Sequence, residues 1–326
     1  MIRLPTQLPD HMDFADTLPL FEYDRTAPLE VQEVASYPRG DSSLDDITYM
    51  GANGRRVAAY VVTPAGKGPF AGVIFMGWTG DASSIRKEFV DEAMSLADHG
   101  VVSVLVSGYF PWLVKPQDED SDRMALIGQV RELRRAIDLL AARPGVDSTR
   151  IAFVGHSMGA MHGAVLAAAD HRVKAAVLMA PHSTWTDWIF EGYGLDAQTE
   201  AEYRAAMVAF DPISYVGHAN PAALFFQFSN TDQFVPADVA QTLYDAASEP
   251  KMIGWYNGGH DLDDAARADR TAWLTEELNL NPRPWAGRRG SLPAPPLSGT
   301  KPNERAVPVP KLGRQSARTG QGLPKR

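Results

Sequence analysis

The sequence predicts an α/β fold in which a mostly parallel sheet is covered by helices on both faces. Short apolar runs, such as 70–76 and 101–106, alternate with amphipathic segments of helical period from residue 70 onward. Before them, an Asn-Gly pair at 53–54 separates two β-rich runs, which favours a hairpin of antiparallel strands. Finally, the apolar run 151–154 meets an Ala-rich segment at a glycine-flanked serine, which is typical of a strand–turn–helix unit.

Each predicted element has its own signal. The strands are expected at 30–36, 46–50, 56–63, 70–76, 101–106, 151–154, 174–180, 222–228 and 251–256. The helices are expected at 83–99, 124–142, 158–169, 237–248 and 263–278. In 124–142 the apolar residues share one face, and Arg131, Arg134 and Arg135 lie elsewhere on the helix. Because ligands of parallel sheets bind beyond the carboxyl ends of the strands, functional residues are expected in the loops that follow them.

The length and charge distribution predict one large domain with appendages. Residues 1–27 are Pro-rich and are expected to form an N-terminal arm, and 28–282 the catalytic domain, with 181–219 as a candidate lid insertion. Residues 283–326 hold ten Lys/Arg and one acid, Glu304, so this tail carries +9 while the rest carries −18, within a total of −9. The tail has too few apolar residues to order itself, and it lacks a nucleic-acid-binding pattern; we expect a solvated extension.

Composition excludes several classes of protein. No stretch approaches the roughly 18 apolar residues that span a bilayer, and the N-terminus lacks the apolar core of a secretory signal. We therefore expect a cytoplasmic protein without a membrane partner. The absence of cysteine rules out disulfides, a thiol nucleophile and Cys-ligated zinc. The histidines show no metal-ligand spacing, so we expect neither metal nor cofactor.

Ser157 is the candidate nucleophile. It stands in Gly155-His156-Ser157-Met158-Gly159 between the predicted strand and helix. A serine held on so tight a turn leaves no room for Cβ atoms two residues away on either side, which explains both glycines. The following helix directs its N-terminal N–H groups toward the position of a developing oxyanion. The alternative interpretation is a glycine-rich turn with a serine N-cap.

A serine nucleophile needs a base and an orienting acid, which follow it along the chain in folds of this kind. Of eight histidines, His260 alone lies in a glycine-rich loop after a late strand. Asp232 follows the strand 222–228, 28 residues before His260, and is better placed than Asp211 or Asp238. The alternatives are a surface-loop histidine and a turn or N-cap aspartate.

The loops after the strands also supply an oxyanion hole and a pocket. The N–H donors of the oxyanion hole are expected to be Met158 and Trp78, which follows the strand 70–76. Thr79 is the second choice after Trp78. Aromatic residues in the other loops predict an apolar substrate pocket, although these residues could equally pack in the core. The predicted pocket residues are Thr79, Tyr109, Trp112, Trp185 and Trp188.

With these residues in place, the chain resembles the α/β-hydrolase superfamily, and within it the dienelactone-hydrolase-like and acyl-peptidase-like esterase branch. The resemblance covers about residues 30–280 and rests on the serine motif, on Asn230-Thr231-Asp232 with Val235-Pro236, and on Gly259-His260-Asp261. It implies Ser157 as nucleophile, His260 as base and Asp232 as acid. Many relatives have His-Gly where this chain has Met76-Gly77, and dienelactone hydrolases use a cysteine, which this chain lacks.

The sequence thus predicts a serine hydrolase that cleaves small-molecule carboxylic esters. A peptidase, thioesterase or acyltransferase on the same triad stays open, because the fold does not fix the substrate. So does a non-catalytic binding protein on the same scaffold.

Overall fold

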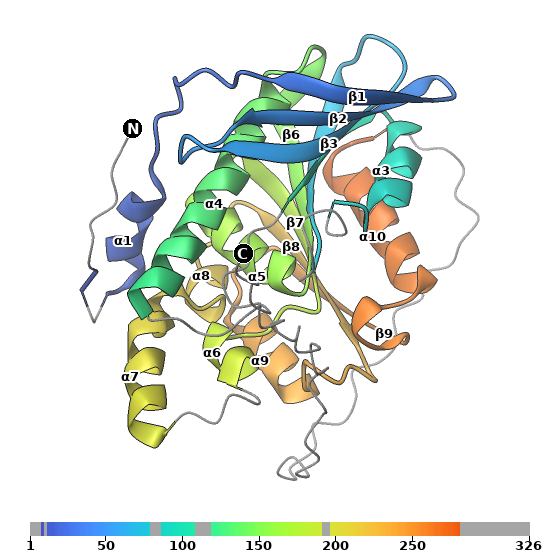
Figure 1. Ribbon diagram of the computed structural model, residues 1–326. Helices are drawn as coiled ribbons and strands as arrows, with labels where there is room; N and C mark the ends of the chain where they lie inside the picture. The colour runs from blue at the N-terminus through green and yellow to red at the C-terminus, as the bar shows by residue number, and fades with distance from the viewer. Residues whose placement is uncertain (1–7, 10–11, 79–85, 108–118, 191–195, 281–326) are drawn as a thin grey trace, which may run out of the picture.

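A computed structural model describes residues 8–9, 12–78, 86–107, 119–190 and 196–280, and its centre is one nine-stranded sheet (Figure 1). The strand order is β1-β2-β3-β5-β4-β6-β7-β8-β9. The first three strands and the β3–β5 pair are antiparallel, and all later pairs are parallel. The strands are β1 Gln32–Arg39, β2 Ser42–Met50, β3 Arg56–Thr63, β4 Phe70–Met76, β5 Val101–Val106, β6 Val146–His156, β7 Val173–Met179, β8 Ala223–Ser229 and β9 Lys251–Tyr256.

Helices cover both faces of the parallel part of the sheet, as the sequence predicted. The α-helices are α1 Phe14–Thr17, α3 Val90–Ala97, α4 Glu119–Ala141, α5 Met158–Ala169, α6 Trp185–Phe190, α7 Ala197–Met207, α8 Ile213–Val216, α9 Ala237–Ala246 and α10 Asp264–Glu277. Successive strand residues enter two different cores because side chains alternate between the faces. In β8, Leu224 and Phe226 join the core under α4, α5 and α9, whereas Phe225 joins the core under α3 and α10 (Figure 1).

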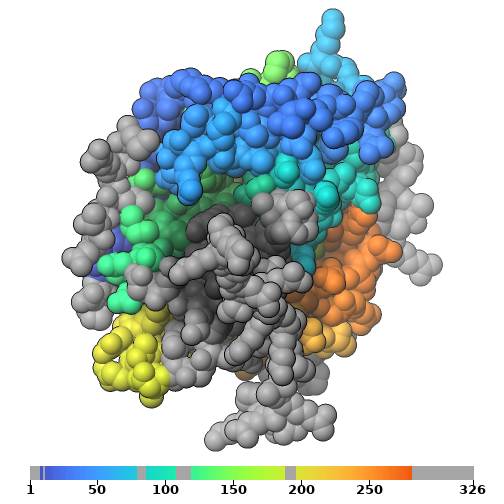
Figure 2. All heavy atoms as spheres, in the orientation of Figure 1, coloured from blue at the N-terminus to red at the C-terminus, as the bar shows by residue number. Residues whose placement is uncertain are grey.

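The element boundaries follow the predictions with local shifts. The Asn-Gly signal is confirmed by the β2–β3 hairpin, in which Met50 pairs with Arg56. Helix α4 begins at Glu119, before the predicted residue 124, and three acids in its first turn favour a helix start there. Helix α3 begins only at Val90, while residues 83–85 of the predicted segment lie outside the described residues. The antiparallel strands form one end of the molecule and α7 lies at the other (Figure 2).

The N-terminal segment 12–27 is bound to α4 through arginine side chains that the sequence placed away from the apolar face. Arg131, Arg134 and Arg135 are all buried, and they donate to the carbonyls of Leu20, Phe21 and Ala27 respectively. Phe21 is fully buried in the larger core. The segment therefore contributes to the packing of the sheet-containing body, because it supplies acceptors that buried guanidinium groups require.

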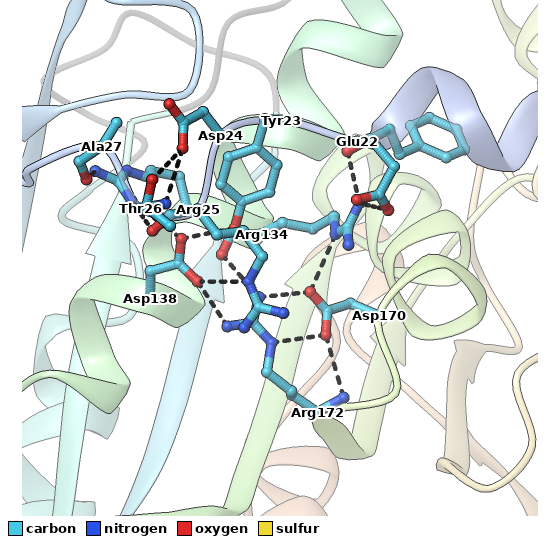
Figure 3. Close-up of polar contacts among 12 residues, drawn as sticks. Glu22, Tyr23, Asp24, Arg25, Thr26, Ala27, Arg134, Asp138, Asp170 and Arg172 are labelled. Atoms are coloured by element: carbon cyan, nitrogen blue, oxygen red, sulfur yellow. Dashed lines mark hydrogen bonds and ion pairs between the residues drawn. The ribbon is translucent and has the colours of Figure 1, made fainter. Parts of the chain in front are cut away.

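A network of acids extends this contact toward β7 (Figure 3). Asp138 of α4 accepts from the Tyr23 hydroxyl at 2.7 Å and from Arg172 at 2.6 Å. Asp170, just after α5, accepts from Arg172 and from Arg134. Three parts of the chain, the N-terminal segment, α4 and the α5–β7 turn, are thus joined by charge-assisted hydrogen bonds.

The candidate lid, 181–219, includes α6, α7 and α8, and its described residues are tied to the body. The Tyr203 hydroxyl donates to Asp122 of α4 at 2.6 Å, and the Tyr215 hydroxyl donates to Thr17 at 2.8 Å. The indole N–H of Trp185 donates to the Phe210 carbonyl at 2.7 Å. In the described part of the chain, no helix is both long and apolar enough to cross a bilayer. The predicted tail, 283–326, lies outside the described residues.

Candidate active site

Ser157 lies on a strained turn between β6 and α5. Its backbone has φ 56° and ψ −120°, in a region that non-glycine residues seldom adopt. Its N–H donates to the Met179 carbonyl of β7 at 2.7 Å, and its carbonyl accepts from Met161 at 3.0 Å. The sheet and the helix therefore fix the turn from both sides. Ser157 itself is 8% exposed.

Both glycines of this turn are required by contact, as predicted. A Cβ on Gly155 would lie 2.6 Å from the backbone of Gly159. A Cβ on Gly159 would overlap the Met76 carbonyl and lie 2.6 Å from that of Gly77, at the end of β4. The turn is thus packed directly against the loop after β4. Met158, the first residue of α5, has one of the N–H groups that lack a partner within a helix.

His260 and Asp232 are brought together across 28 residues. His260 Nδ1 lies 2.9 Å from Asp232 Oδ2, and the aspartate side chain is 1% exposed. The other oxygen, Oδ1, accepts from the N–H groups of Phe234 and Val235. The carboxylate can therefore fix the ring so that Nε2 is the nitrogen available for chemistry.

Ser157, Asp232 and His260 all follow the carboxyl ends of neighbouring strands. In the register, the last residue of β6, His156, pairs with Met179, and the last residue of β8, Ser229, pairs with Tyr256 at the end of β9. Within the described residues, no hydrogen bond joins the Ser157 hydroxyl to the His260 ring. Such bonds are often long without substrate, and they shorten when substrate binds.

Comparison with known proteins supports the fold. A family model described as the alpha/beta hydrolase fold matches residues 121–212, from α4 through Ser157 into the helices after β7. An acetyl xylan esterase from Paenibacillus sp. R4 superimposes with a TM-score of 0.68 over 82% of this chain and 96% of its own, at 19% identity. The chain therefore has the alpha/beta hydrolase fold, and the family model covers 92 of its 326 residues.

Two further similar proteins have names that indicate different chemistry. A protein proposed to be a dienelactone hydrolase, from Klebsiella pneumoniae, superimposes with a TM-score of 0.52 over 78% of this chain and 99% of its own, at 16% identity. A polyketide transferase of Stachybotrys chlorohalonatus is 28% identical over 149 residues. That match covers 45% of this chain and 46% of the transferase, so the chain aligns with less than half of that relative.

The predicted oxyanion donor Trp78 already has a partner. Its backbone N–H donates to Glu88 Oε2 at 2.9 Å, while its side chain is 48% exposed. The Trp78 N–H can therefore serve an oxyanion only after it leaves Glu88. The second choice, Thr79, lies outside the described residues.

Of the predicted pocket residues, the structure describes the side chain of Trp185 alone. Trp185 is fully buried, and its ring packs on that of His162 with centroids 4.7 Å apart, so it offers no exposed surface. Trp188 belongs to α6, but its side chain lies outside the described residues, as do Tyr109 and Trp112. The assignment of these residues to a substrate pocket stays a prediction.

Sequence reasoning missed Glu88 as part of this site. Glu88 Oε1 lies 2.6 Å from His156 Nδ1, so the residue contacts the serine turn as well as Trp78. The His156 ring contacts Glu88 through one nitrogen and the carbonyl of His260 through the other. A single acid in a segment of helical pattern carries no signal for a contact 68 residues away.

Proposed function

We propose that this chain is a serine hydrolase that cleaves carboxylic esters through Ser157, His260 and Asp232. The observation that supports it most is the Asp232–His260 pair at the same sheet edge as a serine with positive φ. A serine hydroxyl is a weak nucleophile, and a histidine oriented by a carboxylate is the group that activates it. The positive φ of Ser157 is strain that a merely structural turn would not require.

The reaction follows from these positions. His260 Nε2 accepts the Ser157 proton as the oxygen attacks the ester carbonyl, and Asp232 stabilises the imidazolium that forms. The N–H of Met158 and one from the loop after β4 hold the oxyanion. The imidazolium then protonates the leaving alcohol. Water, deprotonated by His260, attacks the acyl-enzyme and releases the acid and the serine.

Transfer of the acyl group to another alcohol is the second candidate. It is favoured by the match to a polyketide transferase, and it would use the same acyl-enzyme. The two functions differ only in what attacks in the second half of the reaction. The product formed in the presence of an added alcohol, ester or acid, distinguishes them.

Labelling with a fluorophosphonate probe tests the proposal. Wild type should be labelled and should hydrolyse p-nitrophenyl esters, and Ser157→Ala and His260→Ala should do neither. Ser183→Ala is the matched control, because Ser183 is 7% exposed against 8% for Ser157 and follows the neighbouring strand β7. It should be labelled like wild type. A folded wild-type protein that takes no label would refute the proposal.

A further inference from the structure

Glu88 and His156 connect three segments that meet at the candidate site. Glu88 Oε2 accepts from the Trp78 N–H after β4, and Oε1 lies 2.6 Å from His156 Nδ1 in the serine turn. The other ring nitrogen, His156 Nε2, lies 2.9 Å from the backbone carbonyl oxygen of His260. The contacts run from the loop after β4 through the residue before Ser157 to the residue proposed as base.

Both partners of the His156 ring are hydrogen-bond acceptors. A carboxylate and a carbonyl each need a donor, and neutral imidazole has one N–H, so only the protonated ring can donate to both. The ring is 2% exposed and the Glu88 side chain 21%. Burial alone would lower the pKa of His156, but the hydrogen bond and charge of Glu88, the His260 carbonyl and Asp261 outweigh it and raise the pKa above its ordinary value.

The other charged groups near the ring leave this ion pair in place. Glu88 and His156 border a cavity of about 250 Å³, which is also lined by Asp91, Glu92, Asp261, Arg267 and Arg270. Glu92 and Arg270 are paired with each other at 2.8 Å. The remaining charged groups are two acids, Asp91 and Asp261, and one base, Arg267, so the net negative charge of the surroundings favours the cationic form of the His156 ring.

His260 is held through both its ring and its backbone. It lies in the short 3₁₀ helix Gly259–Asp261, and the two residues before it, Gly258 and Gly259, have φ values of 92° and 67°, conformations that glycine adopts readily. Asp232 holds the ring of His260, and His156 holds its backbone. The rings of the two histidines lie with centroids 5.1 Å apart.

We propose that Glu88 and the buried His156 ring form a carboxylate–imidazolium pair that positions the His260 backbone and the Trp78 amide relative to Ser157. The role of the pair in the reaction rests on the proposed function. Both ring nitrogens of His156 are used by Glu88 and the His260 carbonyl, and the residue acts through His260, so it is a positioning residue. The pair also links the loop that carries His260 to the residue after β4 that carries the Trp78 amide.

Nuclear magnetic resonance of the ring nitrogens tests the pair independently of activity. In the wild-type protein, both nitrogens of His156 should stay protonated above the ordinary histidine pKa of about 6.5. His162, which is buried in α5, is the internal control, because burial lowers its pKa to about 4. In Glu88→Gln, His156 should lose its second proton at lower pH. A neutral His156 in wild type near neutral pH, or titration unchanged by Glu88→Gln, would overturn the proposal.

Two amide substitutions separate the contacts of His156. In His156→Asn the amide nitrogen takes the place of Nδ1 and keeps the Glu88 contact, whereas in His156→Gln it takes the place of Nε2 and keeps the His260 contact. If the contact to His260 positions the base, His156→Asn should lower kcat for a p-nitrophenyl ester by roughly tenfold with KM unchanged. His156→Gln should lower kcat by a smaller factor than His156→Asn. Equal activity of His156→Asn and wild type, or equal losses in the two variants, would contradict the positioning role.

The same samples distinguish this proposal from the proposed function. If wild type takes no fluorophosphonate label while His156 is protonated and coupled to Glu88, the ion pair stands and the esterase proposal fails. If wild type labels and hydrolyses while His156 is neutral, the esterase proposal stands and the pair fails.

Discussion

Asp232 is held by backbone N–H groups on one oxygen and holds His260 with the other. Oδ1 accepts from Phe234 at 2.8 Å and from Val235 at 3.2 Å, and Oδ2 lies 2.9 Å from His260 Nδ1. The loop after β8 thereby fixes the carboxylate before substrate arrives. A carboxylate preorganised in this way can orient the imidazole and stabilise its charged form without moving.

Removal of this carboxylate should slow the chemical step. We expect Asp232→Ala to lower kcat/KM for p-nitrophenyl esters by about 10³–10⁴-fold, because the ring loses both its orientation and its counter-charge. Steady-state kinetics and the rate of fluorophosphonate labelling measure the loss. Asp238→Ala, at an exposed position in the first turn of α9, is the control and should keep wild-type kinetics. Wild-type kinetics in Asp232→Ala would exclude Asp232 as the orienting acid.

Gly159 should tolerate no side chain. A Cβ there would overlap the Met76 carbonyl, and both the sheet and α5 would have to shift, so we expect Gly159→Ala to lower the free energy of unfolding by about 3 kcal/mol. Gly128→Ala provides the comparison: in α4, the nearest atom to its Cβ would be the side-chain nitrogen of Asn53 at 3.3 Å. Because alanine favours helix, that variant should stay within about 1 kcal/mol of wild type. Denaturant unfolding of both variants measures the difference, and equal stabilities would contradict the close packing at Gly159.

Asp211 should make stability depend on pH. Burial raises the pKa of this carboxyl to about 7, and its Oδ1 accepts from the Trp185 N–H at 2.8 Å. Since the unfolded pKa is about 3.9, the folded chain binds the extra proton between that value and about 7. The contribution of Asp211 is therefore fully present at low pH and is lost as the pH rises through about 7.

The substitution Asp211→Asn should remove this dependence. Asparagine keeps an acceptor for the Trp185 N–H but carries no charge at any pH, so the variant should gain stability over wild type as the pH rises from about 5 to 8. Thermal unfolding at several pH values measures the gain. A difference between the two proteins that stays constant across this range would show that Asp211 does not titrate there.

The sequence by itself determined the parts of this protein whose cause is local. The hairpin at Asn53-Gly54, the strand–turn–helix around Ser157 and the glycines beside it each depend on backbone conformations that only certain residues adopt. The parallel direction of the later strands could be predicted as well, because a helix between two apolar runs returns the chain to the same end of the sheet. Asp232 and His260 were found because parallel strands place the ends of their loops at one edge.

Only the tertiary structure decided which polar groups meet. Glu88 with His156, and Arg134 with Phe21 and Asp170, join residues that are distant along the chain, and no periodicity marks such partners. It also decided that Trp185 packs in the core, because burial depends on what α6 lies against and not on the residue type. Hydrophobic periodicity and turn preferences depend on residues that are close together in the sequence. The pairing of charged groups depends on distances between residues that become neighbours only after the chain has folded.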